Sequence, residues 1–130
     1  MVDFLYTPFK NSYLSQAANQ VDFDADTIKA TLVRSSTYTP NQTTDDFYND
    51  VTTPVSTSAA LSMTVSGANV DCTDFSFTAV SAGAAIDLMV LYKDTGVSTT
   101  SRVAAKYDVS VTPNGADIDV VVHASGLFTM

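Results

Sequence analysis

The stretch IDLMVLY at residues 86–92 is the most apolar run of the chain, and it decides the fold class. A short apolar run with β-branched and aliphatic side chains, ending at a turn signal, predicts a strand covered on both faces. The turn signal is KDTG at residues 93–96. We therefore expect residues 86–92 to form a central strand of a sheet.

Further strand patterns lie on both sides of this run. Apolar side chains alternate with other residues at 103–111, which predicts a second strand. PNG at 113–115 predicts a tight turn before the next strand. The remaining strands are predicted at residues 28–33, 55–65, 69–80 with a bulge near 73–74, 116–124 and 127–130. The expected fold is mainly β, an antiparallel β-sandwich of about six or seven strands.

The composition supports strands and turns. All 14 acidic residues are Asp, which prefers turns and caps, and the chain contains no Glu. A length of 130 residues fits one domain with an ordinary core. The single cysteine excludes an intramolecular disulfide, so packing must hold the fold together.

Two segments carry helical patterns. Aromatic and aliphatic side chains recur at helical spacings in residues 1–20, and Pro8 suits a first turn after Thr7. A second, short helix is predicted near residues 44–51, capped by Thr44. We expect residues 1–20 to form an N-terminal helix or arm and residues 21–130 to form a single β-sandwich domain. The N-terminal segment either covers one end of the core or docks on a neighbouring subunit.

The charge balance disfavours two classes of partner. The net charge is −8, and the six basic residues are scattered. Nucleic acids and anionic membranes both need clustered Lys and Arg, so neither is expected as a partner. Residues 1–4, MVDF, lack a basic region before an apolar stretch, so we expect no signal peptide.

Asp22, Asp24 and Asp26 have the alternate spacing with which a calcium loop begins. The glycine at position six and the glutamate at position twelve of an EF-hand are replaced by Thr27 and Val33. We therefore expect these carboxylates to cap backbone groups in a turn, and we predict no metal site and no cofactor.

Two other pairs of residues are candidates for catalysis. Cys72 and His123 are the only thiol and imidazole, but both lie in strand patterns and not at a helix N-terminus that would activate a thiolate. Asp117 and Asp119 share one face of a strand, where alternating Asp usually keeps an edge soluble. No nucleophile, base and stabiliser come together in the sequence, so we expect no catalytic residues and no enzyme activity.

Seven segments form an ordered set along the chain: LY at 5–6, FK at 9–10, DADTIKATLV at 24–33, YTPN at 38–41, DFYNDV at 46–51, VLYKDTG at 90–96 and VTPNGADI at 111–118. In order and spacing, across nearly the whole chain, they resemble a family of small virion structural proteins of tailed bacteriophages.

The resemblance implies a non-enzymatic component of the virion, assembled in the cytoplasm of the bacterial host. A capsid decoration or cement protein is the first expectation, present in many copies or as a homo-oligomer on the major capsid protein. A tail or neck component is the alternative, and a glycan-binding attachment module is a second one. The expected partner-binding residues are Phe4, Leu5, Tyr6, Phe9, Tyr13 and Leu14.

Overall fold

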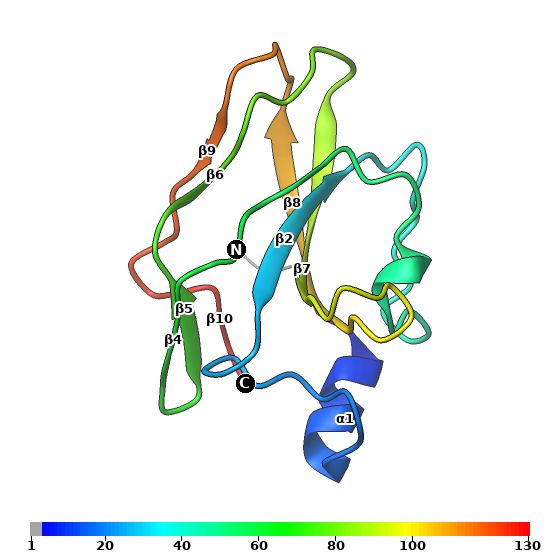
Figure 1. Ribbon diagram of the computed structural model, residues 1–130, viewed down its shortest axis with the longest axis vertical. Helices are drawn as coiled ribbons and strands as arrows, with labels where there is room; N and C mark the ends of the chain where they lie inside the picture. Colours follow the sequence, from blue (N-terminus) through cyan, green and yellow to red (C-terminus); the bar gives the residue numbers. More distant parts are fainter. Residues whose placement is uncertain (1–3) are drawn as a thin grey trace.

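The computed structural model describes residues 4–130, and their fold is mainly β (Figure 1). Strands hold 35% of the residues and helix 9%, which confirms the predicted class. The elements are β1 (Phe4–Leu5), α1 (Thr7–Ser15), β2 (Ile28–Val33), the 3-10 helix η1 (Tyr48–Asp50), β3 (Ser56–Thr57), β4 (Met63–Ser66), β5 (Asn69–Cys72), β6 (Phe75–Phe77), β7 (Ile86–Lys93), β8 (Val103–Val111), β9 (Ile118–Val120) and β10 (Phe128–Thr129).

The largest sheet is antiparallel and has the order β1-β8-β7-β2-β3. The apolar run at residues 86–92 lies in β7, the middle strand, as the sequence predicts. Its neighbours β2 and β8 match the predicted strands at 28–33 and 103–111. Both faces of β7 are covered because six of its eight residues are buried.

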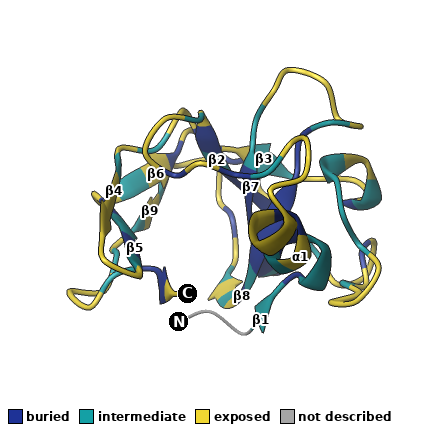
Figure 2. Cartoon of the chain, turned by 90° about the horizontal axis from the view of Figure 1, so that it is seen from below, coloured by how far each residue is buried: buried dark blue, intermediate teal, exposed yellow. Residues whose placement is uncertain are grey.

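Smaller β elements lie across from this sheet. β10, β5 and β4 form a three-stranded sheet, and β6 pairs with β9. Figures 1 and 2 show these pieces on one side of the larger sheet, and the colours of Figure 2 mark buried residues in both layers. Phe77 and Val70 of this second layer belong to the same buried core as Tyr107 of β8. The arrangement is sandwich-like.

The structure shortens some predicted elements and divides others. The predicted strand at 69–80 is broken at residues 73–74 into β5 and β6, and the one at 116–124 keeps only β9. β10 supplies the predicted last pairing, against β5. The described residues hold ten strands against the six or seven expected, because β1 is additional and the predicted strands at 55–65 and 69–80 are each divided in two, into β3 and β4 and into β5 and β6.

The predicted short helix near residues 44–51 is a single 3-10 turn, and it begins after Phe47 instead of Thr44. The Asp50 carboxylate accepts hydrogen bonds from the backbone N–H groups of Asp46 and Phe47, at 3.0 and 3.5 Å. Phe47 also forms a β-bridge with Arg102. These contacts hold Phe47 in an extended conformation, so no α-helix passes through it.

The N-terminal segment packs on the same core as the rest of the chain. β1 pairs with β8, and the backbone N–H of Tyr6 donates to Ala104 O at 2.9 Å. α1 has its Pro in the first turn, as predicted, and ends where Gln16 adopts a left-handed conformation, with φ of 52°. The rings of Phe9 and Phe23 meet edge to face, with their centroids 5.8 Å apart. This contact fixes α1 on the loop that precedes β2.

Candidate functional site

The structure divides the six predicted partner-binding residues into three groups. Tyr6 and Phe9 are fully buried, while Phe4 and Leu5 in β1 are partly buried. Tyr13 and Leu14 are 50% and 80% exposed, in the last turn of α1. Tyr6 and Phe9 are therefore core residues, which corrects the predicted set. Tyr13 and Leu14 remain available to a partner.

Tyr6 is held by a chain of hydrogen bonds. Its hydroxyl lies 2.7 Å from that of Tyr38, which donates to the Asp45 carboxylate at 2.7 Å. Burial raises the pKa of both tyrosines well above the usual range. Both hydroxyls stay protonated at neutral pH. The hydrogen bonds between Tyr6, Tyr38 and Asp45 therefore connect the loop after β2 to the start of α1.

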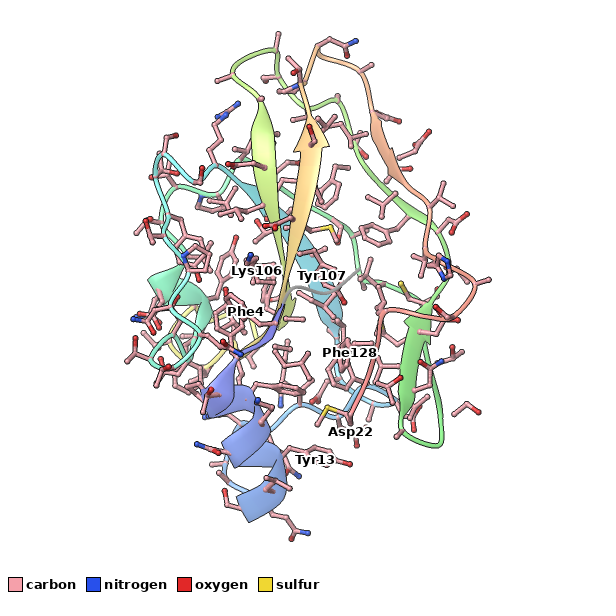
Figure 3. All side chains as sticks on the ribbon, turned by 180° about the vertical axis from the view of Figure 1, so that it is seen from behind. Phe4, Tyr13, Asp22, Lys106, Tyr107 and Phe128 are labelled. Carbon is pink, nitrogen blue, oxygen red and sulfur yellow. The ribbon has the colours of Figure 1, made fainter. Side chains whose placement is uncertain are left out.

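Phe4 lies between two neighbours on the same side of β1. Its ring meets that of Tyr6 edge to face at 5.1 Å, and the Lys106 ammonium lies 5.0 Å from its centroid. Figure 3 shows Phe4 and Lys106 together where β1 meets β8. These contacts account for the half-burial of Phe4 within the domain.

A groove of about 430 Å³ opens beside the exposed turn of α1. Figure 3 places Tyr13, Asp22 and Phe128 at this end of the molecule. Tyr13 forms one side of the groove, residues 20–24 form another, and the turn of the β4–β5 hairpin lies across from them. The full lining is Tyr13, Gln20, Val21, Asp22, Phe23, Asp24, Val65, Gly67, Ala68, Val70 and Met130.

The apolar side chains that line the groove differ in how far they are exposed to solvent. Val21, Phe23 and Val70 are buried, whereas Val65 and Met130 are 38% and 43% exposed. Val65 and Val70 are paired directly across β4 and β5, so their side chains share one face of the hairpin. Sequence analysis missed Val65 and Met130, because the pattern of a short strand does not show which face stays uncovered.

The loop at residues 20–24 is fixed from behind by Lys93 and Arg102. Lys93 Nζ donates to Gln20 O at 3.1 Å and forms an ion pair with Asp26 at 3.1 Å. Arg102 Nε donates to Asn19 O at 3.1 Å. The wall of the groove is therefore held in place before any partner arrives.

The three alternating Asp residues have different roles in this loop. The Asp26 carboxylate accepts from the Asp22 backbone N–H at 2.7 Å, and Asp22 Oδ1 accepts from the Asp24 N–H at 3.0 Å. This is the predicted capping of a turn. Asp22 and Asp24 are exposed on the groove, and neither forms an ion pair with any residue of 4–130. Within that range no three His, Cys or acidic side chains gather closely enough to hold a metal ion.

The other candidates for chemistry lie apart from this groove. Burial, with Asp71 and Asp74 nearby, raises the pKa of Cys72 to about 11, so its thiol stays protonated at neutral pH. His123 is exposed, and its Nδ1 lies 2.7 Å from Ser125 Oγ in its own turn. Within residues 4–130, no hydrogen bond joins the Cys72 thiol to the His123 imidazole.

Asp117 and Asp119 bind the neighbouring β6 segment. Asp119 accepts from Ser76 Oγ at 2.7 Å, and Asp117 accepts from the Ala79 backbone N–H at 2.7 Å. Both carboxylates hold the β6–β9 ribbon together, a role that the sequence pattern did not predict.

Comparison with protein-family models and with curated proteins finds no match. Among residues 4–130, no helix has the length and apolar character needed to cross a membrane.

Proposed function

We propose that this chain is a non-enzymatic structural protein of a bacteriophage virion that decorates the capsid by binding the major capsid protein. The resemblance of residues 5–118 to small phage virion proteins supports the class. One structural observation supports a binding role: the last turn of α1 leaves Tyr13 and Leu14 exposed beside a groove, although the same helix is anchored in the core by Phe9.

The position of these side chains favours a partner. Single exposed apolar residues are ordinary on protein surfaces, but grouped ones mark contact sites. Tyr13, Val65 and Met130 line one groove, and Leu14 follows Tyr13 in α1. A decoration protein needs only modest affinity at such a site, because many copies bind a repeating lattice.

Cosedimentation with mature phage heads that lack the protein tests this proposal, with purified tails as the comparison. We expect saturable binding to heads at a fixed ratio to the major capsid protein. Binding to tails alone would move the assignment to a tail or neck component. Binding to neither particle would overturn the virion role.

Point variants locate the contact better than a deletion of the N-terminal segment, which would remove Tyr6 and Phe9 from the core. The double variant Tyr13→Ser and Leu14→Ser changes only exposed side chains and should lose most head binding. The matched control is Val97→Ser with Val121→Ser, at residues that are 55% and 80% exposed and lie outside the groove. The control should bind heads as the unmodified protein does.

A further inference from the structure

We propose that the groove between α1, residues 20–24 and the β4–β5 hairpin binds a segment of the partner that carries Lys or Arg beside an apolar side chain. This inference rests on the proposed virion function and specifies the chemistry of the partner. It follows from three properties of the groove: its apolar surface, its uncompensated carboxylates and its fixed wall.

The apolar surface suits one aliphatic or aromatic side chain of an incoming segment. Phe23 and Val70 are already buried at the base, so they add little new apolar burial when a side chain binds. Tyr13, Val65 and Met130 each retain between 38% and 50% of their surface, which a bound side chain would cover. A volume of about 430 Å³ is of the size that accommodates side chains and not a whole domain.

The rim supplies negative charge that no cation of residues 4–130 balances. Asp26 is already neutralised by Lys93, whereas Asp22 and Asp24 make no ion pair within residues 4–130. No Lys or Arg is among the residues that line the groove. A basic side chain entering the groove would meet two carboxylates and remove their mutual repulsion.

The same charges argue against a second copy of this chain as the occupant. Each copy carries a net charge of −8. Two acidic rims facing one another would repel, since like charges across an interface oppose association. The occupant that the charges favour is a segment of another protein with the opposite sign.

The fixed wall makes the carboxylates more effective. Lys93 and Arg102 hold the backbone of the loop from its inner side, at Gln20 and Asn19. Little ordering is left for a partner to impose, and such preorganisation improves affinity. Because Asp22 and Asp24 are exposed, their attraction acts mainly on the association rate and weakens with salt.

Head binding of matched variants provides the first test. Asp24→Lys reverses a rim charge whose side chain makes no hydrogen bond within residues 4–130, and Val65→Ser removes apolar surface. Each should weaken head binding by about tenfold. The controls are Thr99→Lys and Val121→Ser, at exposed positions outside the groove, and they should change binding by less than about twofold.

The outcomes separate the two proposals. If the unmodified protein binds heads and the groove variants bind equally well, the virion role stands and the groove inference is overturned. If the unmodified protein binds no particle, the virion role fails, and a second measurement decides the groove inference.

The second measurement is an amide chemical-shift titration of the full chain with a peptide that alternates lysine and leucine. We expect shifts centred on Tyr13, Asp24 and Val65, fading as salt is raised. The matched peptide that alternates glutamate and leucine should cause none. Equal shifts over the β6–β9 ribbon, or none in the groove, would overturn the inference whether or not heads are bound.

Discussion

The ring of Phe9, in the N-terminal helix, meets the ring of Phe128, in the last strand, edge to face with their centroids 6.4 Å apart. Phe23 completes the cluster, at 5.5 Å from Phe128. Three segments that are distant in sequence therefore share one aromatic contact. This cluster supports the groove from beneath, because Phe23 also lines it.

Phe9→Ala should destabilise the protein by about 3–5 kcal/mol, because it leaves a cavity where a fully buried ring stood. Urea unfolding measured by circular dichroism gives this free energy. Leu14→Ala, one turn further along α1 and 80% exposed, is the control and should change the free energy by less than about 0.5 kcal/mol. Equal effects of both changes would contradict the burial of Phe9.

Gly126→Ala should also be costly. Gly126 has φ of +93°, and a Cβ there would lie 2.9 Å from the Asn69 side chain and 3.0 Å from Val70 O. We expect a loss of about 1–3 kcal/mol in the free energy of unfolding. Gly67→Asn is the comparison: φ is +60°, a Cβ meets nothing within 4 Å, and Asn tolerates this conformation. Its thermal unfolding midpoint should stay close to that of the unmodified protein.

Asp94 should contribute to stability against acid. The Lys29 ammonium, 2.7 Å away, and the Gly96 N–H hold the pKa of Asp94 below its usual value. A lowered pKa in the folded state gives stability that is present above the unfolded pKa, near 4, and is lost as pH falls through the folded value. Asp94→Asn should therefore flatten the decline in unfolding free energy between about pH 5 and pH 2.

Asp46 is a control for this measurement, because its pKa is shifted in the opposite direction and so its effect on the unfolding free energy changes with pH in the opposite sense. Burial and the neighbouring Asp50 raise the pKa of Asp46. Its contribution is present below the unfolded pKa and is lost as pH rises through the folded value. Asp46→Asn should thus gain stability relative to the unmodified protein as pH rises from about 3 to 6. If both variants shift the acid limb in one direction, the assigned causes are wrong.

Cys72 should react slowly with thiol reagents while the protein is folded. Its pKa of about 11 leaves roughly one thiolate per thousand at pH 8, and the side chain is buried as well. Chromogenic disulfide exchange should be slow in buffer and become fast in urea. The readout is unambiguous because the chain has one cysteine. Rapid labelling of the folded protein would show that β5 opens readily.

The strands that the sequence predicts best are those whose own residues show alternation or a continuous apolar run. The strands at residues 28–33 and 103–111 have the predicted bounds, and the run at 86–92 is central, because alternation and an apolar run both reflect burial directly. The segment at 44–51 is less predictable. Its helix is limited to one turn by the side chain of Asp50 and by a bridge to Arg102, a partner distant in sequence.

The groove is also difficult to predict from the sequence, because it depends on contacts between residues that are distant in sequence. Tyr13 and Leu14 are among the predicted contact residues and are exposed, while Phe9 has the same periodicity and is buried. The difference depends on Phe128, which no local pattern connects to α1. Asp22 and Asp24 were correctly expected in a turn, but their place on an apolar groove becomes visible only when the β4–β5 hairpin lies opposite.

The strand order also has a consequence for synthesis. β2 ends at Val33, but its hydrogen-bonded neighbour β7 begins only at Ile86. At roughly 5–20 residues per second, translation leaves the apolar β2 without that neighbour for several seconds. During that interval the edge of β2 that later pairs with β7 has no strand beside it. An unpaired apolar edge is open to pairing with other chains, so β2 is the segment most exposed to misassembly during synthesis.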